Sequence, residues 1–378
     1  MFRKLLCLFL LLGSFPMLAQ LNNSALTYDY SIQEKDSNTL WFGVRALAFN
    51  KNNEYFNQIA DGLTLFGYQF NPYLEYHAGK HWVIESGLYI QQDFGNNKIT
   101  TIQPTISIKY LEGTHSIIIG SLENSYNHNL IEPLYDYEKG LTDRQEFGLQ
   151  AILSEERLYA DAWVSWETMI YRGDPKQEEV VGGISSYYVL GSLFGGEISF
   201  PVQFVVYHRG GQIDSNPTPI ETITNGAVGL KYVKPSTGWV KQWYLDGYYV
   251  GHKVFDAGGG DTYYLGGDAM YFNAGFRANK GFEVLGSYWY GKGYYPIIGG
   301  HLYSSESFNY KSPDHIEEQR GLFVLRFFLN QNIKPGLRVS TRFEPYYDLG
   351  NKKFEFSHGM VVSTNPEFLI RQIKKIKF

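Results

Sequence analysis

Charged side chains that could act together lie in two distant parts of the sequence. Basic residues with one acidic neighbour occur near the C-terminus, at Arg326, Arg338, Arg342 and Glu344. Acidic residues occur in a long polar stretch, 124–143, at Glu132, Asp136, Glu138 and Asp143. If the fold brings the two sets together, their opposite charges create a field that orients dipolar solutes and screens ions. Such a field selects solutes without covalent chemistry.

Patterns for catalysis or metal binding are weak. The nine histidines do not have a zinc-type spacing, and the single glycine–aspartate stretch 256–261 lacks the repeats of calcium-binding loops. Ser357 and His358 are the one adjacent serine–histidine pair, and no partner motif accompanies them. We therefore expect no metal, no cofactor and no enzymatic activity. A lipid-modifying or proteolytic membrane enzyme is the less favoured alternative.

The chain repeats one unit: a segment of roughly ten alternating residues, a long polar connection, a second such segment and a tight turn. A membrane barrel explains this asymmetry, because its outer loops can grow while its periplasmic turns stay short. The rhythm runs through about thirteen predicted strands, up to Gly291, and places the N-terminus of the barrel on the short-turn side.

Where the alternation is clean, it predicts which residues share a face. In 195–207, Phe200 and Phe204 alternate with Ser199 and Gln203. The segments 98–110, 321–329 and 337–344 show the same separation of apolar from polar or charged residues. An apolar outside with a charged inside indicates a wet barrel interior.

Composition and the N-terminus agree with a secreted barrel. Aromatic residues make up 17% of the chain and the net charge is −5, which gives no argument for nucleic acid. Residues 1–19 have the basic start, apolar run and small-residue end of a signal peptide, and Cys7, the single cysteine, lies within it. We expect residues 20–39 to form a short periplasmic arm and residues 40–378 one barrel domain.

The strand number is ambiguous after Gly291. Sixteen strands leave 292–318 as one large outer loop, whereas eighteen make strands of 299–310 and 367–378 as well. Both numbers are even, which keeps both chain ends in the periplasm. We favour eighteen, because the terminal aromatic Phe378 fits the strand ending that the barrel-assembly machinery reads. The predicted fold is an all-β, transmembrane antiparallel barrel of 16–18 strands. At its strand ends we expect an aromatic girdle of Trp41, Trp82, Trp239, Trp243 and Trp289.

Over the whole mature chain, these features resemble porin-like outer-membrane β-barrels of the Bacteroidota type. The resemblance rests on the signal ending at Ala19-Gln20, the aromatic strands, the two connection lengths and Phe378. It implies localisation in the outer membrane of a Gram-negative bacterium, contact with lipid and lipopolysaccharide, and assembly by the barrel machinery. In general porins a loop at a comparable place folds into the lumen, so loop 124–143 is the predicted constriction, facing Arg326, Arg338 and Arg342.

The resulting functional prediction is a diffusion channel for small hydrophilic solutes. The alternative is a non-conducting barrel that works with partner proteins in assembly, secretion, polymer export or adhesion. The sequence does not separate these two classes.

Overall fold

The computed structural model describes residues 26–27, 36–122, 128–255 and 262–373. Expectations about the signal peptide and Phe378 lie outside these residues. One antiparallel sheet contains all the strands: β1(Thr39–Glu54), β2(Thr64–Ala78), β3(Trp82–Asp93), β4(Thr101–Glu112), β5(His115–Ser121), β6(Phe147–Ser154), β7(Leu158–Thr168), β8(Glu179–Leu193), β9(Gly196–Arg209), β10(Glu221–Pro235), β11(Val240–Phe255), β12(Gly266–Ala278), β13(Phe282–Lys292), β14(Gln319–Lys334), β15(Leu337–Asp348), β16(Lys353–Thr364) and β17(Glu367–Gln372).

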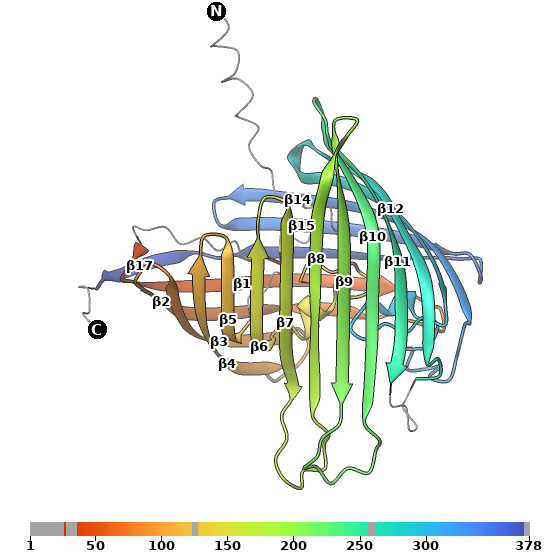
Figure 1. Cartoon of the computed structure of the whole chain (residues 1–378), viewed down its shortest axis with the longest axis horizontal. Coiled ribbons are helices and arrows are strands. Elements are labelled where there is room, and N and C mark those ends of the chain that lie inside the picture. The colour runs from red at the N-terminus through yellow and green to blue at the C-terminus, as the bar shows by residue number, and fades with distance from the viewer. Residues whose placement is uncertain (1–25, 28–35, 123–127, 256–261, 374–378) are drawn as a thin grey trace, which may run out of the picture.

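The sheet closes into a barrel because β1 pairs with β2 on one side and with β16 on the other (Figure 1). Each strand pairs with the next in the sequence from β1 to β16. The predicted all-β antiparallel barrel is therefore confirmed, with β1–β16 forming the closed wall.

The preference for eighteen strands was wrong. Segment 299–310 forms no strand; it contains the short helix η3(His301–Tyr303), and Glu306 makes an isolated bridge with Ile316. Within the predicted last strand, 367–378, residues Glu367–Gln372 form β17. It pairs with β1 at Thr39–Gly43, just beyond the part of β1 that pairs with β16. Thus β17 extends the line of β16 past Pro366 and adds no further wall strand.

Connections alternate in length at the two ends of the barrel. One end carries the tight turns, such as 79–81 and 194–195, and the other carries long connections, such as 122–146, 169–178, 210–220 and 293–318. We name the second the long-loop end. A short connection at this end, 349–352 between β15 and β16, departs from the expected rhythm. In Figure 1 the loops after β7 and β9 project furthest.

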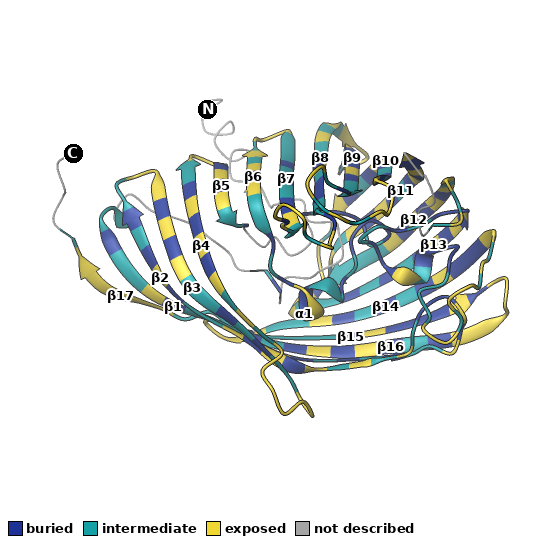
Figure 2. Cartoon of the chain, turned by 90° about the horizontal axis from the view of Figure 1, so that it is seen from below, coloured by how far each residue is buried: buried dark blue, intermediate teal, exposed yellow. Residues whose placement is uncertain are grey.

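Burial alternates along the strands as the period of two requires (Figure 2). Phe200 and Phe204 are exposed on the outer wall, whereas Ser199 and Gln203 are buried toward the lumen. Lys109, Arg326 and Arg342 are likewise buried on the inner face. The wall is therefore apolar outside, as the sequence pattern predicted. Its inner face carries buried polar and charged residues and also a buried apolar cluster that includes Val205 and Val324.

Candidate functional site

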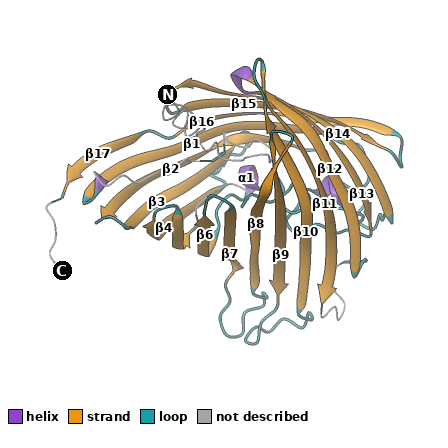
Figure 3. Ribbon diagram, turned by 45° about the horizontal axis from the view of Figure 1, so that its top comes forward, coloured by secondary structure: helices purple, strands orange, loops and turns teal. Residues whose placement is uncertain are grey.

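The described part of the long connection before β6 enters the lumen. It carries the short helix α1(Lys139–Thr142), which lies inside the curve of the barrel (Figure 3). Leu130, Ile131 and Leu134 are buried against lumen-facing wall residues such as Trp163. The backbone N–H of Ile131 donates to Oε1 of Gln203, at an N···O distance of 2.9 Å. Apolar contact and a directed hydrogen bond together hold this loop, residues 128–146, which we call the first lumen loop.

His128 anchors the start of the first lumen loop. Its Nε2 lies 2.7 Å from Oε2 of Glu146, and its Nδ1 lies 3.0 Å from Oδ2 of Asp161. The imidazole ring also stacks on Trp163, with a centroid distance of 3.8 Å. Burial lowers the pKa of His128, but the carboxylates of Glu146 and Asp161 outweigh burial and raise it to about 10. The ring is therefore an imidazolium at neutral pH.

A second lumen loop, residues 293–318, packs on the first. The backbone N–H of Gly300 donates to the carbonyl of Glu132 at 2.9 Å, and the hydroxyl of Tyr294 donates to the carbonyl of Pro133 at 2.8 Å. A Cβ atom at Gly299 would overlap the carbonyl oxygen of Pro133, so only glycine permits this approach. The two loops form one unit within the lumen.

A charged network joins this unit to the wall. The carboxylate of Glu132 contacts the guanidinium of Arg326 and lies 3.7 Å from that of Arg342. Glu344 lies 3.1 Å from Arg326 and 2.6 Å from Arg342. Four of the eight residues that the sequence singled out are thus in direct ion pairs with one another.

The other four residues differ in position. Asp136 and Glu138 lie beside the network in the first lumen loop, and Glu138 is 4.0 Å from Lys51. Asp143 is largely exposed and pairs with Lys139 at 3.1 Å. Arg338 is separate: its guanidinium approaches the carbonyl of Thr27 at 3.5 Å.

Lys51 is a member of the network that sequence reasoning missed. Its Nζ lies 3.2 Å from Glu344 and 2.6 Å from the hydroxyl of Ser357. The alternation of β1 puts Lys51 on the lumen face, a signal that was available in the sequence.

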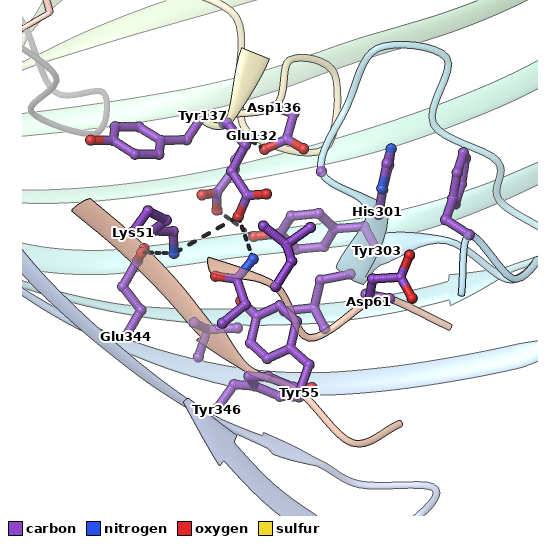
Figure 4. Close-up of a pocket in the computed structure, with 18 of the residues that line it drawn as sticks. Lys51, Tyr55, Asp61, Glu132, Asp136, Tyr137, His301, Tyr303, Glu344 and Tyr346 are labelled. Carbon is purple, nitrogen blue, oxygen red and sulfur yellow. Dashed lines mark hydrogen bonds and ion pairs between the residues drawn. The ribbon is translucent and has the colours of Figure 1, made fainter. Parts of the chain in front are cut away.

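A cavity of about 150 Å³ lies between the two lumen loops and the wall (Figure 4). Its charged lining consists of Lys51, Asp61, Glu132, Asp136, Glu138, Arg326, Arg342 and Glu344, with His301 beside them. Burial lowers the pKa of His301, and its ring stacks on Phe308 at a centroid distance of 3.9 Å. Five acidic side chains and three basic ones therefore line one small space.

The predicted tryptophan girdle needs two corrections. Trp82, Trp239 and Trp243 are exposed on the outer wall. Trp41 lies on the same face of β1 as the lumen-facing Lys51 and is directly opposite the buried Glu75. Trp289 is fully buried in the lumen, where it packs on Tyr294 and Tyr303. Its neighbours Tyr288 and Tyr290 are the outward residues, because adjacent strand residues face opposite ways.

The same rule separates Ser357 from His358. Ser357 is buried toward the lumen, whereas His358 is exposed on the outer wall. Their adjacency in one strand prevents them from acting as a nucleophile and base on one substrate.

A different imidazole–hydroxyl pair occurs on the outer wall. Nδ1 of His208, near the end of β9, lies 2.9 Å from Oγ1 of Thr222 at the start of β10. The two residues are directly opposite in the register, and both are half-buried. His208 continues the outward series of Phe200 and Phe204. This pair joins a base to a hydroxyl at the long-loop end of the wall.

One carboxylate on the outer wall, that of Glu178, belongs to the segment that leads into β8, the strand next to β9. Glu178 precedes β8, and its side chain accepts a hydrogen bond of 3.0 Å from the indole of the exposed Trp166. Val180, two residues further on, is directly opposite His208. The hydrogen bond to Trp166 turns the carboxylate of Glu178 toward β7, on the side of β8 away from His208 on β9. Within the described ranges, no group of side chains is arranged to hold a metal, and no helix is long and apolar enough to cross a membrane.

The fold of this chain is that of an outer-membrane β-barrel. A loop-deletion mutant of OmpT, an outer membrane protein of Vibrio cholerae, is similar in structure at 8% identity, with a TM-score of 0.50 and coverage of 87% of this chain and 99% of that one. OprD of Pseudomonas aeruginosa has a TM-score of 0.49 at 10% identity, covering 91% of this chain and 100% of that chain. OccK2 of the same organism has a TM-score of 0.48 at 11% identity, covering 87% and 98%. The predicted porin-like barrel and outer-membrane localisation are confirmed.

The sequence family is more specific. Residues 32–373 match the model of the lipid A 3'-O-deacylase-type family, so the chain belongs to that family. No curated protein matches the chain. The family is one of enzymes, and the expectation that this protein has no enzymatic activity was wrong. The error arose because the search relied on residues adjacent in sequence, whereas strand register can assemble a site without any such motif.

Proposed function

We propose that this protein is an outer-membrane hydrolase that removes an ester-linked acyl chain from lipid A. The observation that carries the proposal is the His208–Thr222 pair, which a member of a deacylase-type family presents on the outer wall of its barrel. A lipid substrate can reach this wall from the membrane without entering the lumen.

The position of the pair suits such a substrate. Long loops of outer-membrane barrels face the cell exterior, so the long-loop end corresponds to the outer leaflet. His208 and Thr222 lie at this end, next to the apolar outer surface that includes Phe204 and Val206. Acyl chains would lie along that surface, with their ester groups near the boundary with the sugar.

The proposed reaction uses the hydrogen bond between the two side chains. The reaction requires the tautomer of His208 with its proton on Nε2, so that the hydroxyl of Thr222, 2.9 Å away, donates to Nδ1; Nδ1 accepts the proton as Oγ1 attacks the acyl carbonyl. The sugar oxygen then leaves with the proton from His208, and the acyl chain remains on Thr222. Water, deprotonated by His208, then attacks the acyl carbonyl; the bond to Thr222 breaks, Oγ1 takes the proton back from His208, and the fatty acid is released.

The test is deacylation of lipid A by the full chain in proteoliposomes, followed by mass spectrometry of the lipid. His208→Ala should lower the rate by roughly 10²–10⁴-fold, the usual contribution of a general base. His358→Ala is the matched control, since that histidine also faces outward but lies on β16, and it should leave the rate unchanged.

Substitutions of Thr222 distinguish the nucleophile from a merely structural residue. Thr222→Ser should remain active and Thr222→Ala should not. Thr224→Ala is the control, because Thr224 lies on the same face of β10, where its hydroxyl bonds the carbonyl of Lys253. Full activity of Thr222→Ala would contradict the proposed attack by this hydroxyl.

We propose solute diffusion through the lumen as a second function. The observation in its favour is the charged network of the lumen, in which Glu132 pairs with Arg326 and lies 3.7 Å from Arg342. Paired charges of this kind create a field that would screen small hydrophilic solutes. Deletion of residues 127–141 should enlarge the single-channel current in planar bilayers. An unchanged current would exclude the loop as a constriction.

A further inference from the structure

We infer that Leu26 and Thr27 form an internal plug, which closes the barrel lumen against small hydrophilic solutes until it is released. These two residues precede the wall strands in the sequence, and the structure places them inside the lumen. The inference rests on the second proposed function, solute diffusion, and is independent of the proposed hydrolysis on the outer wall.

The side chain of Leu26 is buried between the wall and the first lumen loop, with an exposed fraction of 1%. Its apolar cluster also contains residues of the wall and of the loop: Leu47, Phe49, Val361, Tyr137 and Leu141. Leu47 and Phe49 face the lumen, because they share one face of β1 with Lys51. Leu26 therefore fills the space between β1, β16 and the first lumen loop.

Two arginines hold the backbone of the plug. The guanidinium of Arg144, from the first lumen loop, donates to the carbonyl of Leu26. The guanidinium of Arg338, from the wall, approaches the carbonyl of Thr27 at 3.5 Å. Arg144 is buried, so its hydrogen bond lies in a site of low dielectric constant, where it is stronger than in water. The plug is thus joined to the loop and to the wall through its backbone as well as its side chain.

The first lumen loop meets most of the wall without the plug. Its apolar residues share one buried cluster with wall residues of every strand from β7 to β15, from Trp163 to Tyr346. On β2 and β3, the amides of Gln69 and Gln91 donate to the carbonyl of Leu141 at 3.3 Å and 3.1 Å. These contacts hold the loop across the lumen whether or not Leu26 is in place.

Toward β1 and β16, the loop meets the wall in two ways. Glu138 accepts a hydrogen bond of 2.6 Å from the amide of Asn53, which is a polar contact. Nearer the end that carries the tight turns, the contact is apolar and runs through Leu26. Water and ions can enter among polar groups, whereas a dry apolar constriction excludes them. Release of Leu26 would therefore open a wet passage beside β1 and β16.

A single leucine gives the plug a limited hold on the lumen. Full burial of one such side chain favours the seated state by roughly tenfold to a hundredfold. The first lumen loop buries several apolar side chains, including Leu130, Ile131 and Leu134. The plug therefore leaves the lumen more readily than the loop does.

The first test measures the access of reagents to position 26 in the full chain. Leu26→Cys, made together with Cys7→Ser to remove the single native cysteine, is treated with a charged maleimide in detergent. It should react roughly tenfold more slowly than Leu265→Cys, the ratio expected from burial of one apolar side chain. Leu265 is the control because it is 53% exposed. Equal rates at the two positions would overturn the inference.

The second test measures the current through Leu26→Lys in planar bilayers. A lysine here would lie beside Arg144 and Arg338 in an apolar cluster, so repulsion and burial should both release the plug. The mean current should exceed that of the wild type by roughly tenfold. Leu26→Met keeps the apolar contact, and Leu265→Lys adds the same charge at an exposed position, so both should match the wild type. An unchanged current in Leu26→Lys would overturn the plug.

Deletion of residues 127–141 separates failure of the plug from failure of solute diffusion. A current that rises on this deletion but not with Leu26→Lys would show that the lumen conducts and that Leu26 does not close it. A lack of current in both variants would contradict solute diffusion itself, and the plug with it.

Discussion

At the residue scale, His128 shows how a buried charge can hold a loop inside a barrel. Its two ring nitrogens are used by Glu146 and Asp161, one from the loop region and one from the wall. Removing a partner from such a group leaves an uncompensated buried charge, which typically costs about 3–5 kcal/mol. His128 should therefore control whether the first lumen loop stays docked.

The pH dependence of this docking has a definite sign. The pKa of His128 is raised to about 10 in the folded state, so its stabilisation is complete below about pH 6.5 and is lost as the pH rises through about 10. Burial raises the pKa of Glu146, but the charge of His128 outweighs it and lowers that pKa, so this residue's stabilisation is lost on acidification. Docking should be strongest between about pH 5 and 6.5.

Limited proteolysis of the first lumen loop measures this docking. Cleavage of the wild type within residues 128–146 should increase between pH 6 and pH 10, with protease activity normalised on a free peptide. His128→Gln should be cleaved readily at both values, because glutamine stays neutral. A wild type that is cleaved equally at pH 6 and pH 10 would show that the imidazolium does not secure the loop.

The sequence predicts which way some side chains face and fails for others. The inward position of Gln203 and the outward position of Phe204 follow from the period of two, and both were predictable. Trp289 was not, because it stands between two tyrosines and the alternation does not distinguish three successive aromatic residues. The His208–Thr222 pair depends on the register between β9 and β10, which a single strand pattern does not specify.

At the element scale, the contact between the two lumen loops depends on Gly299. Any side chain at this position would meet the backbone of Pro133. Backbone atoms cannot move aside as a flexible side chain can, so one of the loops must shift. The sequence shows a glycine at position 299 but gives no sign of the long-range contact that requires it.

Gly299→Ala should therefore loosen both loops and lower the free energy of unfolding by about 1–3 kcal/mol, the usual cost of overpacking a filled site. Gly251→Ala is the control, since a Cβ atom there would meet nothing within 4 Å. The measurement is urea unfolding in lipid vesicles. Equal stability of the two variants would argue against close packing of the loops.

At the scale of the whole molecule, the barrel class was predictable and its strand number was not. Long and short connections alternate because every hairpin crosses the same membrane, with a short turn on the periplasmic side and a longer loop outside. The segment 293–318 breaks this rhythm because it packs inside the lumen and pairs with no wall strand. The last wall strand is also interrupted at Pro366, which lacks the N–H that a continuous ladder would need.

The whole molecule thus separates two environments. The lumen holds the charged network and the small cavity, while the outer wall presents His208 and Thr222 toward lipid. The proposed hydrolysis belongs to the wall, and the proposed solute diffusion belongs to the lumen. Variants in one environment should leave the activity of the other unchanged.

The most direct measurement is the mass of lipid A after incubation with the wild-type chain and with His208→Ala in the same proteoliposomes. We predict that the wild type lowers the mass by one acyl chain and releases the corresponding fatty acid, while His208→Ala leaves the lipid intact. Lipid A that keeps all its acyl chains with the folded wild type, or loses one equally with His208→Ala, would contradict the proposed site.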